Sequence, residues 1–462
     1  MHHWRLITCD ANHRICKLLF TLMKEICKPD AALARVVLPQ KVQPGVFYVP
    51  SQFVLSFSHK GTEYAFHTFT KQLIEARLPS SAHAGEGFDD LIEAMFLVPE
   101  DRDECAYYES IAGMMRLYGQ KKGVPTYTIM PTLACNARCV YCYEEGVKQV
   151  SMTPEIVEQT IRYILETRTK DRITLSWFGG EPLLRPDVID RITTRLTEEG
   201  VPFRSVIVTN GSLITPEIID RMLGSWKLKR VQVSMDGAEP DYLARKRYYR
   251  DADQYRTVME AIGRLSEAGI TVTVRVNVDE GNWPGIPQFM EDMRRGVKHK
   301  KHVSLYFSPL MNVRAGEDDL AMWEKIVAAG HLISDAGFKP YSYTAPSMKF
   351  RANRCMADGG SVVIGPDGSL YPCEHCPPES RFGDIFRGVT DENAKRTFTR
   401  ADRTRDMCRS CTFLPECTSF ASCPWVDAHC REMHMLVALD ALRRRIDSKE
   451  PATEEPDGES VC

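Results

Sequence analysis

The sequence predicts an α/β protein whose central part is a partial (β/α)6 barrel. Between residues 125 and 345, six strand-like apolar runs alternate with helical segments, which is typical of a parallel sheet with crossover helices. Two of the helices begin with Thr-Pro-Glu, at Thr153 and Thr215. This tripeptide supplies an N-cap residue, a proline in the first turn and an early acidic residue. Six units are too few for the eight-stranded closed barrel, so we expect an open one.

The expected elements follow one another without long gaps. The strands are residues 127–133, 173–178, 205–208, 230–234, 272–278 and 303–307, and the helices are residues 153–167, 186–199, 215–223, 254–268, 286–295 and 320–336. In parallel α/β sheets, ligands bind at the carboxyl ends of the strands. Side chains that follow the strands are therefore the candidates for a functional site.

A loop after the first strand carries three cysteines. Cys135, Cys139 and Cys142 have the spacing C-x3-C-x2-C, and Tyr141 directly precedes the last. Iron–sulfur clusters normally take four cysteine ligands, so three thiolates leave one iron of a cubic four-iron cluster free to bind a small molecule. The alternative is a zinc knuckle, but such sites usually pair two C-x2-C units or include histidines.

This loop and its position resemble those of the radical S-adenosylmethionine (SAM) enzymes. The resemblance implies that SAM binds the open iron and is cleaved to methionine and a 5′-deoxyadenosyl radical, which removes hydrogen from an unactivated carbon. Other positions on the same rim also resemble the family's cofactor contacts. They are Tyr141 in the loop, the GGEP residues Gly179, Gly180, Glu181 and Pro182 near the methionyl amine, Asn210, Ser234 and Asp236 at the strand ends, Arg247 (or Arg245) for the carboxylate with Ser234, and Arg275 and Asn277 for the ribose.

A second group of cysteines lies beyond residue 346 and resembles the SPASM extension of peptide-modifying radical SAM enzymes. The resemblance implies two auxiliary [4Fe–4S] clusters, three clusters in all. One would take Cys408, Cys411, Cys417 and Cys430, and the other Cys355, Cys373 and Cys423, with Cys376 as a fourth ligand or an iron left open to substrate. The interval from Cys417 to Cys423 is two residues longer than in the family pattern. C-x2-C pairs also fit zinc ribbons, although this region has few histidines. Glu374, next to Cys373, is a candidate catalytic base.

The flanking regions suggest four segments: 1–120, the barrel at 121–345, the SPASM-like region at 346–447, and an acidic, disordered tail at 448–462. In the first segment we expect an amphipathic helix near 14–27, strands at 46–57 and 63–69 joined by a turn at 59–62, and helices at 70–76, 88–97 and 101–118. Such a winged-helix-like module resembles leader-recognition domains, which bind peptides by strand addition. A structural cap on the barrel is the alternative. A docking helix is expected at 431–446.

Charge and composition exclude several classes of function. The chain has 62 acidic and 59 basic residues, so its charge gives no reason to expect a nucleic-acid partner. No secretory signal or membrane-spanning segment is visible. Sixteen cysteines in such a chain indicate metal binding in a reducing cytoplasm rather than disulfides.

The resemblance to SPASM-containing radical SAM enzymes implies a maturase for a ribosomally made precursor peptide with a leader sequence. The expected product is a thioether between a cysteine sulfur and a carbon, and flavodoxin or ferredoxin is the expected electron donor. The alternatives are a carbon–carbon cross-link or formylglycine formation, as in sulfatase maturation. A multi-cluster electron-transfer protein without substrate chemistry is the alternative from another class, but it would need neither the open iron nor the rim residues.

Overall fold

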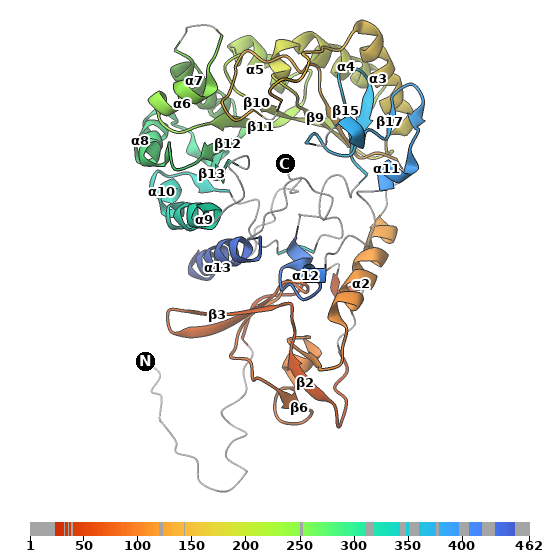
Figure 1. Ribbon diagram of the computed structural model, residues 1–462, viewed down its shortest axis with the longest axis vertical. Coiled ribbons are helices and arrows are strands. Elements are labelled where there is room, and N and C mark those ends of the chain that lie inside the picture. Colours follow the sequence, from red (N-terminus) through yellow and green to blue (C-terminus); the bar gives the residue numbers. More distant parts are fainter. Residues whose placement is uncertain are drawn as a thin grey trace.

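Six parallel strands in sequence order form the centre of the computed structural model, as the sequence predicts (Figure 1). They are β8 (Thr126–Ile129), β9 (Ile173–Trp177), β10 (Phe203–Thr209), β11 (Leu228–Met235), β12 (Thr271–Val278) and β13 (Val303–Pro309). A short parallel strand, β14 (Lys339–Pro340), adds to β13 at one edge. The structure describes residues 24–31, 33–35, 37, 40–119, 123–142, 144–249, 253–310, 318–341, 348–350, 360–375, 378–396, 406–417 and 430–448.

Helices cover the outer face of this sheet (Figure 1). They are α3 (Pro154–Thr167), α4 (Pro186–Glu198), α5 (Pro216–Leu223), α6 (Glu239–Lys246), α7 (Gln254–Glu267), α8 (Ile286–Gly296), α9 (Asp318–Ala328) and α10 (Gly330–Asp335). Two features were not expected from the sequence. The helix α6 lies between β11 and α7 in the chain. The helix expected at 320–336 is divided into α9 and α10 near Gly330, where an added Cβ atom would lie 2.7 Å from Nη1 of Arg444.

Local sequence explains these elements. The hydroxyl oxygens of Thr153 and Thr215 accept hydrogen bonds from the backbone N–H groups three residues later, so both are N-caps, as expected. Every second residue of β12 from Val272 to Val278 is fully buried in the main core. Arg275 and Asn277 alternate with these valines and therefore point to the inner face of the sheet.

The C-terminal region continues the barrel sheet. Strand β15 (Val362–Ile364) pairs in parallel with β8, and the antiparallel strands β16 (Ser369–Tyr371), β17 (Gly383–Asp384) and β18 (Gly388–Val389) follow. Gly368, with φ +83°, completes the tight turn expected in this hairpin. The sheet thus runs across the boundary expected near residue 346. The remaining helices here are α11 (Glu392–Arg396), α12 (Asp406–Arg409) and α13 (Cys430–Ser448).

The N-terminal region is richer in strands than expected. Its four-stranded sheet contains β1 (Lys24–Cys27), β5 (Leu73–Glu75), β4 (Thr62–His67) and β3 (Val54–His59), and its three-stranded sheet contains β6 (Ala82–His83), β2 (Phe47–Pro50) and β7 (Leu97–Pro99). The turn at 59–62 is confirmed, with φ of 52° at Lys60 and 80° at Gly61. The helices are α1 (Asp89–Glu93) and α2 (Glu104–Gly119).

Several helix predictions for this region are wrong. Residues 73–75 form strand β5, because Lys71 adopts a left-handed φ of 69° and reverses the chain so that Leu73 and Ile74 pair with β4. Residues 24–27 of the expected first helix form strand β1, and its residues 14–23 lie outside the described residues, as does the expected tail after 448. Only α2 has the length of an expected helix, so the described module is not winged-helix-like.

Helix α13 packs between the barrel and the N-terminal sheet (Figure 1), which confirms the expected docking helix. Met433 and Val437 share a core cluster with Trp323 of α9. Further along the helix, Leu442 packs in a cluster with Phe57 of the N-terminal sheet. No helix in the described parts of the chain is long and apolar enough to span a membrane.

His67 links the two N-terminal sheets and predicts a pH-dependent stability. Its ring is fully buried, contacts the Met95 carbonyl through Nε2 at 3.1 Å, and accepts a hydrogen bond at Nδ1 from the backbone N–H of Phe69. Burial lowers the pKa of His67 to about 3. The unfolded chain takes up a proton near pH 6.5 and the folded chain does not, so stability falls as the pH falls below 6.5.

We expect the free energy of unfolding, measured with urea, to fall by about 2 to 3 kcal/mol between pH 6.5 and 4.5 because of His67. The variant His67→Gln, which does not titrate, should lose this part of the pH dependence. The matched variant His331→Gln, at an exposed position, should keep it. An unchanged slope in His67→Gln would show that this histidine is not the titrating group.

Candidate functional site

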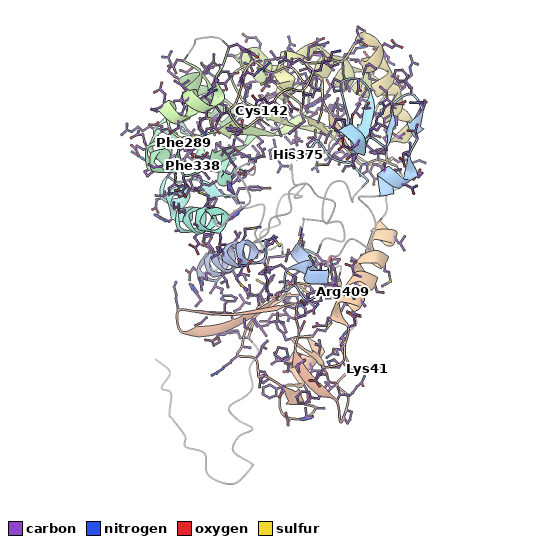
Figure 2. The ribbon with its side chains drawn as sticks, viewed as in Figure 1. Lys41, Cys142, Phe289, Phe338, His375 and Arg409 are labelled. Carbon is purple, nitrogen blue, oxygen red and sulfur yellow. The ribbon has the colours of Figure 1, made fainter. Side chains whose placement is uncertain are left out.

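The cysteine loop lies at the carboxyl end of β8, as the sequence predicts. Cys135, Cys139 and Cys142 are free, partly buried thiols, and Figure 2 labels Cys142 among the elements of the barrel. Burial, together with the nearby charges of Glu181, Cys139 and Cys142, raises the pKa of Cys135 to about 11, so the three thiols are within electrostatic range of one another. In the described residues no three potential ligands already form a closed metal site. Three free thiols on one short loop are nevertheless a suitable donor set for an iron–sulfur cluster.

The GGEP residues contact the backbone of this loop. Gly180 and Glu181 donate backbone hydrogen bonds to the carbonyls of Thr132 and Ala134, at 3.1 and 2.9 Å. A Cβ atom on Gly179 would lie 2.4 Å from the Thr132 carbonyl oxygen, and one on Gly180 would lie 2.4 Å from that of Ala134. The two glycines therefore allow close contact with the cysteine loop itself. The sequence predicted contact with the cofactor, and the structure supplies this different reason for the motif.

Glu181 connects this turn to the next strand. Its side chain is fully buried and accepts hydrogen bonds from the N–H of Leu183, the hydroxyl of Thr209 and the N–H of Asn210. Burial raises the pKa of Glu181, while these donors stabilise its charged form. Pro182 is buried at the start of the 3-10 helix η3 (Pro182–Leu184). Glu181 thus acts as a positioning residue in this structure.

Asn210 binds the cysteine loop directly. Its Nδ2 donates to Oδ1 of Asn136 at 2.8 Å and lies 4.0 Å from Sγ of Cys135. Its own Oδ1 accepts hydrogen bonds from the N–H and hydroxyl of Ser212. The predicted residue is therefore next to the loop, where it orients Asn136, a contact that the sequence did not indicate.

The strand ends of β11 and β12 form a buried polar network with Tyr141. The Tyr141 hydroxyl donates to Oδ1 of Asp236 at 2.6 Å, and Asn277 Nδ2 donates to both groups. Asp236 is fully buried, and its backbone carbonyl accepts from Asn282. Burial, together with the nearby charge of Asp236, raises the pKa of Tyr141 well above its usual value, which keeps the phenol protonated. Three of the predicted residues thus meet in one cluster.

Lys246 is the cation of this network, and the sequence analysis missed it. Its Nζ donates to Oγ of Ser234 at 2.8 Å and lies 3.5 Å from Oδ2 of Asp236, and the side chains of Lys246 and Asp236 are 2% and 0% exposed. Burial opposes the charge on Lys246, but Asp236 and Tyr141 outweigh this effect and raise its pKa. Tyr242 and Lys246 are the buried residues of α6, four positions apart, so helical periodicity was the signal that could have found it.

The structure does not place Arg247 in the site. This residue ends α6 in a left-handed conformation with φ 48°, and its exposed side chain donates to the Ala244 carbonyl. The alternative, Arg245, forms a bidentate pair with Asp279 at 3.0 and 2.9 Å. The left-handed cap turns the backbone after Lys246, so Arg247 points to solvent. Arg245, by contrast, is largely buried, and its guanidinium carbon lies 5.7 Å from the centre of the Tyr141 ring.

Arg275 and Glu374 provide buried polar atoms without partners. Ser234 pairs with Arg275 across β11 and β12, so both face the barrel interior. Nε of Arg275 and Oε2 of Glu374 have no hydrogen-bond partner among the described residues, which is costly unless a ligand supplies one. Burial raises the pKa of Glu374 to about 7. Its neighbour His375 packs edge-on against Phe178, which directly follows β9. His375 lies on the open side of the barrel (Figure 2).

Most of the C-terminal cysteines are also described. Cys373 follows β16, Cys408 and Cys411 lie at the end of α12 and in the turn after it, Cys417 follows the 3-10 helix η9 (Leu414–Glu416), and Cys430 starts α13; none of these five is in a disulfide. The backbone N–H of Cys411 donates to the Cys408 carbonyl. Burial raises the pKa of Cys411, and the nearby thiol of Cys408 adds to the effect. Cys355, Cys376 and Cys423 lie outside the described residues.

Comparison with known proteins agrees with this geometry. A model of the Radical SAM superfamily matches residues 129–292. An AdoMet-dependent heme synthase from Methanosarcina barkeri is 34% identical over 317 residues, which cover 62% of this chain and 88% of that protein. The chain belongs to the radical SAM superfamily. It is therefore an enzyme of a family that uses SAM and a [4Fe–4S] cluster, and the convergent thiols and unpartnered polar atoms described above fit both.

Other similar proteins act on different substrates. A serine-type anaerobic sulfatase-maturating enzyme from Bacteroides thetaiotaomicron is 26% identical, with 65% of this chain and 83% of that protein covered. The Bacillus subtilis subtilosin biosynthesis protein AlbA is 25% identical, and the match spans 55% of this chain and 56% of AlbA. The solved structure of native anSMEcpe with bound AdoMet superimposes with a TM-score of 0.56 at 16% identity, over 70% of this chain and 99% of that one, which shows a common fold.

The buried network predicts which cation matters for cofactor binding. Lys246→Met should weaken SAM binding to the anaerobically reconstituted protein at least about tenfold, because Asp236 would remain buried without a counter-charge. Isothermal titration calorimetry measures this affinity. The neighbouring variant Arg247→Ala should change it less than about threefold. A larger effect at Arg247 than at Lys246 would contradict the placement of the cation.

Proposed function

We propose that this enzyme matures a ribosomally made precursor peptide by forming a thioether between a cysteine sulfur and a carbon. When bound, the reduced cluster and SAM supply the 5′-deoxyadenosyl radical that removes a hydrogen atom from the target carbon. The observation that carries the proposal is the second set of cysteines beyond the barrel, of which Cys373, Cys408, Cys411, Cys417 and Cys430 are described and form no disulfide. Relatives named for bacteriocin and sulfatase maturation support a peptide substrate.

The thioether reaction sets the requirements for the chain. One S–H and one C–H bond break and one C–S bond forms, so a hydrogen atom, a proton and one electron must leave the reacting atoms. The C-terminal cysteines are candidates for holding two auxiliary [4Fe–4S] clusters, and one of these is the candidate electron acceptor. Glu374 is the candidate base, because burial raises its pKa to about 7 and its Oε2 has no partner among the described residues.

The N-terminal module has two proposed roles. The edge strand β1 pairs only with β5 among the described strands, so it is a candidate for strand addition by the leader of the precursor peptide. The second role follows from the module's contacts with the loop 408–417. The Thr68 hydroxyl donates to the Thr412 carbonyl at 2.6 Å, and Gln52 Nε2 donates to the Arg409 carbonyl at 3.0 Å. The module therefore contacts and supports the loop 408–417.

A buried ion pair completes this support. Nζ of Lys71 lies 2.5 Å from Oε1 of Glu416, the residue before Cys417, and the two side chains are 1% and 9% exposed. Phe413 and Leu414, from the same loop, are buried in clusters with residues of β3 and α2. The loop that carries three of the cysteines is thus fixed from the N-terminal side by both apolar and charged contacts.

Two relatives favour other reactions. The sulfatase-maturating relative supports formylglycine formation as a second candidate, and the heme synthase supports a reaction on a heme precursor. Mass spectrometry of a co-expressed cysteine-containing peptide separates these outcomes. A thioether removes two hydrogens and one alkylatable thiol per link. Formylglycine from serine removes two hydrogens without consuming a thiol, and heme synthesis leaves the peptide unchanged and produces a heme absorption spectrum.

The two sets of cysteines should separate cofactor cleavage from product formation. Cys139→Ala should abolish the release of 5′-deoxyadenosine from SAM, because it removes a ligand of the cofactor-binding cluster. Cys411→Ala should retain this release but stop formation of the cross-linked peptide. Chromatography measures the first product and mass spectrometry the second. Peptide turnover by Cys411→Ala would contradict the role proposed for the C-terminal clusters.

The ion pair predicts a defect confined to the C-terminal site. Lys71→Met removes the cation of this buried ion pair, and breaking a buried pair typically costs 3–5 kcal/mol. The anaerobically reconstituted variant should therefore lose about four irons per chain while SAM cleavage persists, and Lys71→Arg should restore part of the iron. Lys60→Met is the matched control, because Lys60 also has a positive φ but is 70% exposed. Equal iron content in Lys71→Met and the unaltered protein would contradict the proposed support of the loop 408–417 by this ion pair.

A further inference from the structure

The inner wall of the barrel carries positive charge and no negative charge. None of the six strands from β8 to β13 contains an aspartate or a glutamate. Three arginines, Arg204, Arg230 and Arg275, alternate along their strands with residues of the outer core and therefore face inward. The nearby acid Asp236 follows the end of β11 and already has Lys246 as its cation. A ligand inside the barrel therefore meets cations on the wall itself.

Arg275 differs from the other cations near the site in its lack of a carboxylate partner among the described residues. Nζ of Lys246 lies 3.5 Å from Oδ2 of Asp236, and Nη2 of Arg245 lies 2.9 Å from Oδ2 of Asp279. Nε of Arg275, in contrast, is buried and has no hydrogen-bond partner in the described part of the chain. Because a buried donor without an acceptor is costly, this guanidinium is suited to a ligand that brings its own negative charge.

The position of Arg275 places it deeper in the barrel than the buried polar network. Asn277, which belongs to that network, is two residues further along β12, a rise of about 6.6 Å toward the carboxyl end of the strand. The residues in register with Arg275 are Ser234 and Tyr306, and neither is an acid. Burial and the charge of Arg275 lower the pKa of His375, so the guanidinium is within electrostatic range of this ring. Arg275 thus lies between the network and the C-terminal region.

We propose that Arg275 is a specificity-determining residue that binds a side-chain carboxylate of the substrate peptide, so that the enzyme selects an aspartate or a glutamate close to the reacting atoms. This inference rests on the proposed peptide substrate. An arginine binds both oxygens of a carboxylate through two parallel N–H donors, and Nε is one of the donors available for this geometry. A neutral amide in the same place would leave the positive charge unpaired on a wall that has no acid of its own.

The test measures binding without turnover. Acetylated and amidated Cys-Glu and Cys-Gln dipeptides differ only in one carboxylate, and equilibrium dialysis against the reconstituted protein, with SAM but without reductant, gives their affinities. The unaltered protein should bind Cys-Glu at least about tenfold more tightly than Cys-Gln. Arg275→Gln should reduce this preference to less than about twofold. Arg275→Lys, which keeps the charge but not the paired donors, should give an intermediate preference.

Two controls separate this role from the alternatives. Arg204→Gln is the matched variant, because Arg204 also faces inward but its Nε donates to Oγ1 of Thr174 at 3.2 Å, and it should keep the full preference for Cys-Glu. The SAM affinity of Arg275→Gln, measured by isothermal titration calorimetry, should stay within about threefold of the unaltered value. A loss of SAM affinity with an unchanged dipeptide preference would make Arg275 a contact of the cofactor ribose and would overturn the proposal.

A third dipeptide identifies the source of the carboxylate. Acetylated Cys-Gln with a free C-terminus should bind no more tightly than its amidated form, and binding as tight as that of Cys-Glu would overturn the assignment to a side chain. Equal binding of Cys-Glu and Cys-Gln by the unaltered protein, or failure of both to bind, also overturns the proposal. Mass spectrometry of the co-expressed peptide reports the thioether separately. A thioether product without a carboxylate preference refutes only this inference, and a carboxylate preference without a peptide product refutes only the proposed function.

Discussion

The close backbone contact between the GGEP turn and the cysteine loop is the constraint on which the site depends. Gly179 and Gly180 bring the turn so near to Thr132 and Ala134 that no side chain fits between them. Two backbone hydrogen bonds then fix the loop to the end of β9. A loop with three free thiols would otherwise have little reason to hold one shape. Packing of backbone on backbone gives it that shape before any cluster is bound.

Charge organises the other half of the site. Asp236, Lys246 and Tyr141 are buried together, and none of them would be stable there alone, because an unpaired buried charge is costly. Their mutual contacts leave Oδ2 of Asp236 without a hydrogen bond, and Nε of Arg275 is likewise unpartnered among the described residues. Asp236 follows β11 and Arg275 lies on the neighbouring strand β12, so this half of the site retains one anionic and one cationic group with an unused hydrogen-bonding atom.

Much of the barrel could be predicted from the sequence, and some of the rest could not, for physical reasons. Strand order and helix starts follow from periodicity and capping residues, as at Thr153 and Thr215. The inward direction of Lys246 depends on a left-handed cap at Arg247, a backbone choice that a run of three basic residues does not reveal. Residues 73–75 were read as helix because their apolar side chains fit either period, and only pairing with β4 makes them a strand. Tertiary contacts decided both cases.

The attachment of β15 to β8 has a mechanical consequence. Cys373 lies two residues beyond β16, and β16 is hydrogen-bonded through β15 to the same strand that leads into the loop of Cys135. Backbone hydrogen bonds therefore run without a break from β16 through β15 to β8, and only residues 130–134 and 372 separate this ladder from Cys135 and Cys373. The two cysteines are consequently carried by one sheet rather than by two separately folded bodies, so their relative position depends on the geometry of that sheet.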